Sequence, residues 1–200
     1  MIKIAVLVSG GGTNLQALID SWKKGGIEGG ELSLVISSAA GALALERAQK
    51  AGIKTITIER KKYANLSDFD SALAAALYEH NTGLVVLAGF LSVIGPQVLK
   101  LYENKIINVH PALIPSFCGK GFYGLNVHKA VLDYGVKITG ASVHFVNEVV
   151  DGGKIILQKA VDVLPGDTPE SLQERVMREA EWVLLPQAVA MFCKGELDIL

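Results

Sequence analysis

The sequence predicts an α/β protein with an open, mostly parallel sheet, helices on both faces, and an antiparallel hairpin in the C-terminal half. Hydrophobic residues make up 50% of the chain and charged residues 20%, a balance typical of a sheet covered on both sides. Strand patterns alternate with helical patterns through the first half, which indicates parallel βαβ units. Two strand patterns follow one another directly in the second half, which indicates the hairpin.

The first half of the chain repeats a strand followed by a helix. A buried-strand pattern at residues 2–8 (IKIAVLV) leads through a run of glycines into a helical pattern over 13–25. Further strand patterns lie at 31–38, 54–59, 83–90 and 105–110, and further helical patterns at 42–52, 66–81 and 96–104. Ser67 is the candidate N-cap of the helix that starts beside it. This order of elements predicts a Rossmann-like sheet.

The second half has a different order of elements. After the glycine-rich segment CGKGFYGLN we expect a helix at 127–135. Two strands at 139–146 and 154–163 then follow, and the loop NEVVDGG joins them into a hairpin. A long helical pattern runs from Thr168 almost to the end of the sequence, with Thr168 and Ser171 both possible caps. Pro186 should kink or interrupt that helix.

Composition and charge limit the classes of function. The net charge of −1 gives no reason to expect binding to nucleic acid or to an anionic membrane. Cys118 and Cys193 form neither a metal-binding spacing nor a disulfide framework, which fits a reducing compartment. The N-terminal run IAVLV is too short for a signal peptide, and no apolar run reaches membrane-spanning length. We therefore expect a soluble cytoplasmic protein.

The segment SGGGTN, residues 9–14, lies between the first strand and the first helix. Glycines there let the backbone approach a ligand closely, and a helix N-terminus presents free N–H groups to an anion. We therefore predict a phosphate-binding site at Gly11, Gly12, Thr13 and Asn14. A tight turn that needs glycine only for its geometry is the alternative.

Two common nucleotide-binding motifs do not fit this loop. The Walker motif requires a lysine after the loop, where the chain has Thr13, Asn14 and Leu15. The dinucleotide fingerprint requires a third glycine in place of Leu15 and an acidic residue near the end of the second strand, which ends in Ser37 and Ser38. The loop therefore favours a phosphate on a molecule smaller than NAD.

The strand KIINVH ends in two polar residues, Asn108 and His110, whose side chains share one face, and Pro111 should end its pairing. Ligands collect at the carboxyl ends of strands in α/β sheets, so we expect an acid–base or electrophilic role for His110. Asp151 is its expected charged partner, because the two glycines after it would let the loop fold back. An ordinary turn at Asp-Gly-Gly is an alternative of equal weight. No second ligand lies at metal-binding spacing from His110, so we expect no metal.

The other three histidines have less specific contexts. His80 lies at a helix end, where a cation suits the helix dipole, and we expect a structural role. His128 follows flexible glycines, and we expect it to face solvent, with a place at the border of a ligand as the alternative. His144 alternates with apolar residues in a strand, and we expect a hydrogen-bonded core histidine.

Four segments together resemble a known family. NVHPALIP and TGASVHFVNEVVDGGKIILQ resemble the folate-dependent formyltransferases, and SGGGTNLQALI and LAGFLSVI narrow the resemblance to the branch that formylates glycinamide ribonucleotide in purine biosynthesis. The resemblance covers the whole chain and implies formyl transfer from 10-formyltetrahydrofolate, as co-substrate, to the ribonucleotide amine, without a metal. Because no linker divides the chain, we expect a single domain over residues 1–200, with a phosphate-binding half (1–105) and a catalytic and folate-binding half (106–200).

The resemblance also implies roles for individual residues. His110 would be the general acid, Asn108 the amide that stabilises the oxyanion, and Asp151 the carboxylate that keeps the imidazole protonated. These types suit the chemistry, because an amide N–H stabilises negative charge and a histidinium can protonate a leaving nitrogen. The remaining implied residues are Gly11, Gly12, Thr13 and Asn14 for the substrate phosphate, Glu181 for the ribonucleotide, and Leu91, Ser92, Val93, Ile94, Asn147 and Val150 for the folate.

The chain departs from the family in one segment, and other functions are compatible with its residues. Many relatives carry an arginine where this chain has Leu66. If that arginine holds the folate tail in the family, Lys61, Lys62 or no residue would take its place here. A 10-formyltetrahydrofolate hydrolase and a non-catalytic nucleotide-sugar-binding module are the alternatives. A methionyl-tRNA formyltransferase is disfavoured, because it would need an RNA-binding extension and a basic excess.

Overall fold

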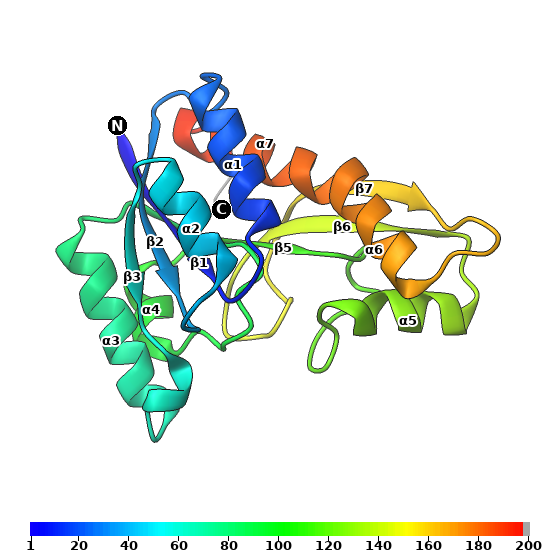
Figure 1. Cartoon of the computed structure of the whole chain (residues 1–200), viewed down its shortest axis with the longest axis horizontal. Coiled ribbons are helices and arrows are strands. Elements are labelled where there is room, and N and C mark those ends of the chain that lie inside the picture. The colour runs from blue at the N-terminus through cyan, green and yellow to red at the C-terminus, as the bar shows by residue number, and fades with distance from the viewer. Residues whose placement is uncertain (198–200) are drawn as a thin grey trace.

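The computed structural model describes residues 1–197, so the last three residues of the predicted domain lie outside it. A seven-stranded sheet lies between helices (Figure 1). The strands are β1 (Ile2–Val8), β2 (Gly30–Ser37), β3 (Lys54–Thr57), β4 (Leu84–Leu87), β5 (Ile106–His110), β6 (Ile138–Phe145) and β7 (Ile155–Asp162). The helices are α1 (Thr13–Lys23), α2 (Leu43–Lys50), α3 (Leu66–Glu79), α4 (Pro96–Leu101), α5 (Leu125–Tyr134), α6 (Pro169–Val176) and α7 (Trp182–Lys194), with a 3-10 turn η1 (Arg60–Lys62) and a π-helical turn η2 (Met177–Glu181).

The strand order and direction confirm the predicted fold class. The strands lie in the order β3-β2-β1-β4-β5-β6-β7. Neighbours from β3 to β5 pair in parallel, whereas β6 pairs antiparallel with both β5 and β7. The two halves of the chain share one sheet, as expected, because β4 pairs directly with β5.

Apolar clusters fill both faces of the sheet. Residues of α1, α2, α6 and α7 pack on one face against side chains such as Val6 and Val143. Residues of α3 and α4 pack on the other face against side chains such as Leu7 and Val85. Adjacent strand residues point to opposite faces, so each central strand needs a continuous apolar run. The high hydrophobic content of the sequence thus reflects a sheet that is buried on both sides.

The strand order reverses between β1 and β4, which is where open α/β sheets bind ligands. The loop after β1 and the segment after β4 meet at this point. The Ser9 N–H donates to Gly89 O at 3.1 Å, and the Leu91 N–H donates to Ser9 Oγ at 2.9 Å. The fold therefore places the glycine loop beside the segment predicted to bind folate.

One predicted helix cap is wrong, and one predicted helix interruption does not occur. Asn65 caps α3 in place of Ser67, since its Oδ1 accepts the Asp68 N–H at 2.9 Å. α7 continues through Pro186, and the irregular turn is instead η2, directly before α7. Thr168 does cap the final helical segment, through a capping box with Ser171.

Candidate functional site

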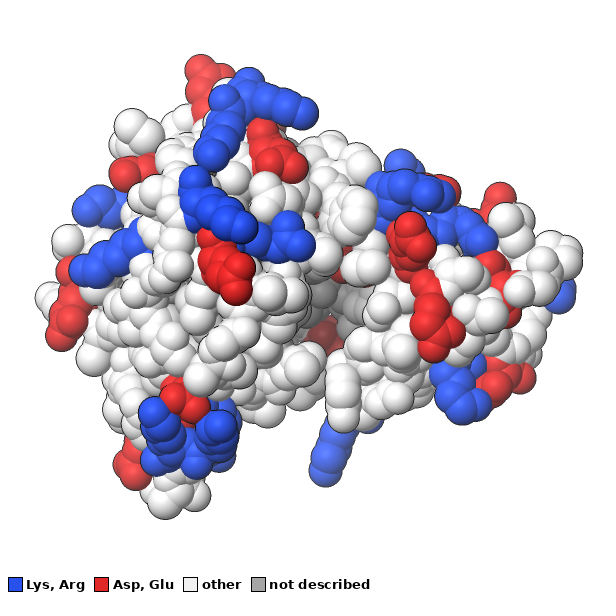
Figure 2. Space-filling model, viewed as in Figure 1, with Lys and Arg blue, Asp and Glu red and all other residues white. Residues whose placement is uncertain are grey.

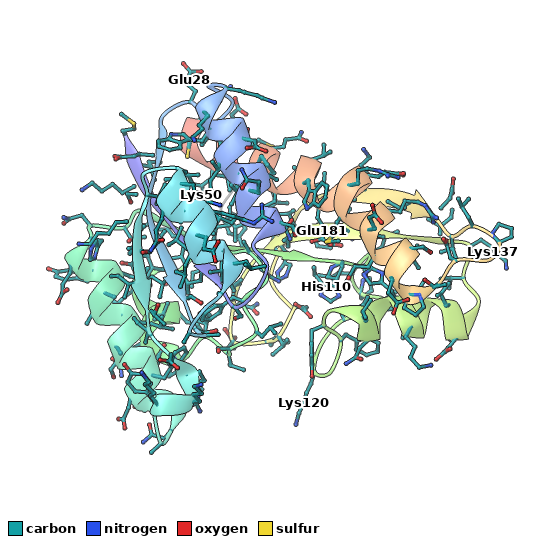
Figure 3. The ribbon with its side chains drawn as sticks, in the orientation of Figure 1. Glu28, Lys50, His110, Lys120, Lys137 and Glu181 are labelled. Atoms are coloured by element: carbon teal, nitrogen blue, oxygen red, sulfur yellow. The ribbon has the colours of Figure 1, made fainter. Side chains whose placement is uncertain are left out.

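A hollow opens in the middle of the face shown in Figure 2, between the part that carries α1 to α4 and the part that carries α5 and α6. Figure 3 shows His110 and Glu181 close to this hollow, on β5 and at the end of η2. Both side chains are buried, with 4% and 6% of their surface exposed. The residues around them come from segments far apart in the sequence.

Asn108 and His110 project from the same face of β5, opposite residues of β6. In the antiparallel register, Asn108 pairs with His144 and His110 pairs with Ser142. His144 Nδ1 lies 2.8 Å from the Phe145 carbonyl oxygen, which only accepts, so Nδ1 carries the hydrogen. His144 Nε2 lies 3.1 Å from Asn108 Nδ2, and in the neutral imidazole it accepts a hydrogen from that amide. This bond fixes the orientation of the Asn108 amide and leaves its second N–H for a ligand.

His144 makes one contact that its strand pattern did not predict. The expected hydrogen-bonded core histidine agrees with its burial and its bond to the Phe145 carbonyl. Its contact with Asn108 was missed, because that contact depends on the register between β5 and β6. No local pattern fixes that register, because the glycine-rich segment and α5 separate β5 from β6 along the chain.

Asp151 lies beside both of the site's histidines. Its Oδ2 is 3.6 Å from His110 Nδ1, and its Oδ1 is 3.7 Å from His144 Nε2. The Gly119 N–H donates to Asp151 Oδ2 at 2.8 Å. The loop after β6 thus folds back over the sheet face that carries Asn108 and His110.

The backbone of this loop differs from the expectation in one respect. The left-handed conformation occurs at Asp151 itself, with φ of 56°, and not at the two glycines that follow. Those glycines are needed for space, because a Cβ at Gly152 would lie 2.6 Å from a Val149 methyl and one at Gly153 would clash with the Phe145 carbonyl. Asp151 therefore reaches the site because the loop packs closely at Gly152 and Gly153, and not because these glycines adopt a left-handed backbone conformation.

The two ring nitrogens of His110 have different surroundings. Nε2 lies 2.9 Å from the Phe117 carbonyl oxygen and donates to it, so Nε2 keeps its hydrogen. Nδ1 faces Asp151 and is therefore the nitrogen that gains and loses a proton. Burial lowers the pKa of His110, and this outweighs the Asp151 charge, which raises it. The carboxylate raises the pKa of His110, as a nearby negative charge should, and burial reverses the net shift.

Asp151 itself stays ionised at neutral pH. Burial alone would raise the pKa of Asp151, but the contacts with His144, the Gly119 N–H and His110 together lower it below its ordinary value. A negative charge is therefore present beside His110 Nδ1 whenever the site is folded at neutral pH.

The expectation that His128 faces solvent is wrong. Its side chain is fully buried, and neither ring nitrogen has a hydrogen-bond partner within residues 1–197. α5 begins at Leu125, earlier than predicted, and His128 lies on the buried side of this helix with Val127 and Val131. Burial, with a smaller effect of His110, lowers the pKa of His128 to about 4, and the imidazole is neutral at physiological pH.

The glycine loop has the geometry of an anion site. Gly12 is the N-cap residue of α1 with φ of 73°, and a Cβ there would lie 2.6 Å from Ala44 Cβ. The backbone N–H groups of residues 11–14 donate to no acceptor within the described chain. Free N–H groups at the start of a helix of this length attract an anion through both hydrogen bonds and the helix dipole.

Glu181 connects this loop to η2. Its Oε2 accepts from Asn14 Nδ2 at 2.6 Å, while Asn14 Oδ1 has no partner among residues 1–197. Burial raises the pKa of Glu181 to about 7, although the Asn14 bond opposes this shift. The carboxyl group is thus near its midpoint at neutral pH. π-helical turns are frequent at functional sites, and here the turn places an acidic group against the loop.

We expect a Glu181→Gln variant to be more stable than the native protein at about pH 8, with the difference shrinking toward pH 5. The folded-state pKa of about 7 exceeds the ordinary value of 4.5, so the folded protein keeps a proton that the unfolded chain loses in this interval. The contribution of Glu181 to the stability of the native protein therefore falls as the pH rises from about 4.5 to 7, by ~3 kcal/mol. Thermal unfolding at several pH values measures the effect. A difference in Tm that does not grow with pH would contradict it.

The segments predicted to bind folate lie side by side at the edge of the hollow. The loop after β6 and the segment after β4 are adjacent in Figure 1, and Ile94 and Val146 pack in one apolar cluster. Leu91 and Val93 have 66% and 58% of their surface exposed, and Val150 has 54%. Ser92 is half-buried and Asn147 is exposed, with its Oδ1 accepting the Val149 N–H. Exposed apolar side chains gathered beside a polar cluster are typical of a ligand surface.

The basic residues near Leu66 are engaged within the protein. Lys61 and Lys62 pair with Glu59 at 3.5 Å and 2.6 Å. Arg60 lies over the Phe69 ring, 5.6 Å from its centroid. These residues belong to or border η1, where Figure 2 shows basic side chains at the lower left. Leu66 packs against the apolar cluster beneath α3.

A separate cavity of about 720 Å³ lies between α1 and α7. Its lining includes Thr13, Gln16, Arg47, Trp182 and Pro186, and it contains neither His110 nor Asp151. We therefore assign the candidate active site to the polar side chains that converge around His110, and not to this cavity.

Residues 1–197 contain neither a metal-binding cluster nor a membrane-spanning helix. Within residues 1–197, no cluster of three or more histidine, cysteine, aspartate or glutamate side chains is placed to hold a metal ion. No helix in that part of the chain has the length and apolar character needed to cross a membrane.

Comparisons with known proteins agree with this geometry. A family model described as formyl transferase matches residues 2–189. A phosphoribosylglycinamide formyltransferase from Haemophilus influenzae is 39% identical, over 100% of this chain and 91% of that protein. The solved structure of glycinamide ribonucleotide transformylase 1 from Symbiobacterium toebii has 42% identity and a TM-score of 0.94, covering 100% of this chain and 91% of its own.

Longer proteins also contain a similar segment. A trifunctional purine biosynthetic protein adenosine-3 from Gallus gallus is 46% identical over 99% of this chain. This chain spans only 19% of the length of that relative, and 14% of the corresponding protein from Drosophila melanogaster.

Proposed function

Because the chain belongs to the formyl transferase family, we propose that it transfers the formyl group of 10-formyltetrahydrofolate to the amine of glycinamide ribonucleotide in purine biosynthesis. One observation carries this proposal: Asn108, His110 and Asp151 converge at the end of β5, on the same edge of the sheet as a loop whose N–H groups are free for a phosphate. The printed names of the relatives from Haemophilus influenzae and Symbiobacterium toebii support the same substrate.

The glycine loop would hold the ribonucleotide. The N–H groups of Gly11, Gly12, Thr13 and Asn14 would bind the phosphate, aided by the dipole of α1. Glu181 and the unpartnered Asn14 Oδ1 are acceptors a short distance from that loop, and they suit the hydroxyl donors of a ribose. The substrate would then extend from the loop toward His110.

The segments after β4 and β6 would hold the folate. Leu91, Val93 and Ile94 offer apolar surface to the flat pterin, and Ser92 lies among them. Asn147 and Val150 would contribute from the facing loop. Flat heterocycles bind well to such apolar walls with backbone groups at their edges.

The proposed reaction breaks one C–N bond and forms another. The substrate amine attacks the formyl carbon, and negative charge develops on the formyl oxygen, where the free N–H of Asn108 stabilises it. His110 delivers its Nδ1 proton to the leaving folate nitrogen as the bond between that nitrogen and the formyl carbon breaks, and the proton that the attacking amine loses returns to His110 Nδ1. Asp151 stabilises the imidazolium from 3.6 Å. Because burial lowers the pKa of His110, the histidinium is a stronger acid than it would be in water.

An assay of folate-dependent formylation tests this proposal. We expect formyl transfer that requires both 10-formyltetrahydrofolate and glycinamide ribonucleotide, with no release of formate when the ribonucleotide is left out. Formate release without an acceptor would identify a hydrolase. Binding of the ribonucleotide without any turnover would identify a non-catalytic module, and either result would contradict the proposal.

Formyl transfer should continue after exhaustive chelation with EDTA. No step above uses a metal ion, and His110 Nε2 already donates its hydrogen to the Phe117 carbonyl and is not free as a ligand. Activity measured before and after dialysis against the chelator gives the result. A chelated, inactive enzyme that zinc alone restores would refute this prediction.

We further propose that the protein works in the cytoplasm and that residues 1–200 act as one formyltransferase domain. The two cysteines are unpaired in the described structure, which suits a reducing compartment. The proposed phosphate site lies in residues 1–105 and the proposed catalytic residues lie in 106–200, so both halves are needed for one reaction.

A further inference from the structure

The carbonyl groups of the glycine loop are held from outside by α2. Arg47 Nε donates to Gly11 O at 2.9 Å, and the Ala44 N–H donates to Gly10 O at 3.1 Å. A second guanidinium nitrogen, Arg47 Nη1, donates to Gln16 Oε1 at 3.2 Å. Arg47 thus ties the loop to both α1 and α2, which lie side by side in Figure 1.

These bonds decide where the N–H groups of the loop point. In a trans peptide unit, the C=O and the N–H of the next residue point in opposite directions. The Gly10 carbonyl is held toward α2, so the Gly11 N–H points away from α2. The Gly11 carbonyl is held toward Arg47, so the Gly12 N–H points away as well. Both N–H groups lack an acceptor in the described chain and are therefore presented together on the opposite side of the loop.

We propose that Arg47 is a positioning residue for the substrate phosphate. It acts through the Gly11 carbonyl, without touching the phosphate, and this inference rests on the proposed function for the identity of the anion. Three consecutive glycines have wide conformational freedom, so an unheld loop would have to be ordered each time a phosphate binds. Holding the carbonyls in advance removes that cost from binding.

The shape of the arginine side chain matters as much as its charge. A guanidinium is planar and presents donors at fixed angles, so it can hold Gly11 O and Gln16 Oε1 at the same time. A lysine ammonium is a compact point charge without this geometry. An Arg47→Lys variant therefore keeps the charge near the loop but loses the paired hydrogen bonds.

Kinetic constants of two Arg47 variants separate geometry from charge. Arg47→Ala and Arg47→Lys should both raise the KM for glycinamide ribonucleotide by about 10-fold or more, while kcat and the folate KM stay within about twofold. Lys50→Ala removes a positive charge from the far end of the same helix (Figure 3) and should change none of the three. An Arg47→Lys enzyme with the native KM would overturn the proposal, and so would a native KM in Arg47→Ala or equal losses for both substrates.

Inorganic phosphate tests the same inference without the reaction. In the full chain labelled with nitrogen-15 glycine, phosphate should shift the amide resonances of Gly11 and Gly12, and its Kd should rise by about 10-fold in Arg47→Ala. This result supports the role of Arg47 even if the native protein does not formylate glycinamide ribonucleotide, which would refute only the proposed function. Equal phosphate affinity in the two proteins, or no binding to the native protein, overturns the role of Arg47.

Discussion

An Asp151→Asn enzyme should bind both substrates normally and turn over about 10²- to 10⁴-fold more slowly. Asparagine keeps the size of the side chain and its oxygen can still accept the Gly119 N–H, so the loop should keep its path. The substitution removes the negative charge that lies 3.6 Å from His110 Nδ1. Burial already lowers the pKa of His110, and without Asp151 the imidazolium becomes rarer at neutral pH. The loss in kcat should therefore shrink as the assay pH falls.

A double-mutant cycle tests whether the two residues act as one unit. His110→Ala should lose activity in the same range, and the double variant should be little worse than the poorer single variant. Glu148→Gln is the matched control, because it removes an exposed carboxylate from the same loop and should leave kcat unchanged. Fully additive losses would mean that His110 and Asp151 act separately, and Asp151 would then be only a turn residue.

A Gly12→Val enzyme should show a KM for the ribonucleotide raised by about 10²-fold or more, with the folate KM within about threefold. Gly12 has φ of 73°, which β-branched residues avoid, and its Cβ would lie 2.6 Å from Ala44 Cβ. The loop must shift to relieve this contact, and the N–H groups that face the phosphate shift with it. Loss of two charge-assisted hydrogen bonds accounts for an effect of about this size.

Gly25→Val provides the control for Gly12→Val at the other end of α1. Gly25 also has a positive φ, of 77°, but a Cβ there would meet no atom within 4 Å and the residue lies outside the phosphate loop, so the variant should keep a nearly native KM. Steady-state kinetics with each substrate varied in turn measures both variants. If Gly12→Val weakens the two substrates equally, a general folding defect is the cause, and the phosphate assignment fails.

Much of the fold could be predicted from the sequence, because its signals are local. The continuous apolar runs, their alternation with helical patterns, and the adjacent strands of the hairpin identified the sheet and its mixed strand directions. Asn108 and His110 at a strand end, and three glycines at a helix start, marked the candidate site in the same way. The errors at Ser67 and Pro186 concern single helix boundaries, where neighbouring residues compete to form the cap or the irregular turn.

The sequence by itself therefore determined the order of the elements and the polar residues at their ends, since strand and helix periodicity act over a few neighbouring residues. Only the tertiary structure decided the contact of His144 with Asn108, the burial of His128, and the hydrogen bond from Arg47 to the Gly11 carbonyl. These contacts depend on strand register and helix packing between segments well separated in the chain. The net pKa of His110 was decided there too, because burial and the Asp151 charge oppose each other and only the folded geometry fixes their balance.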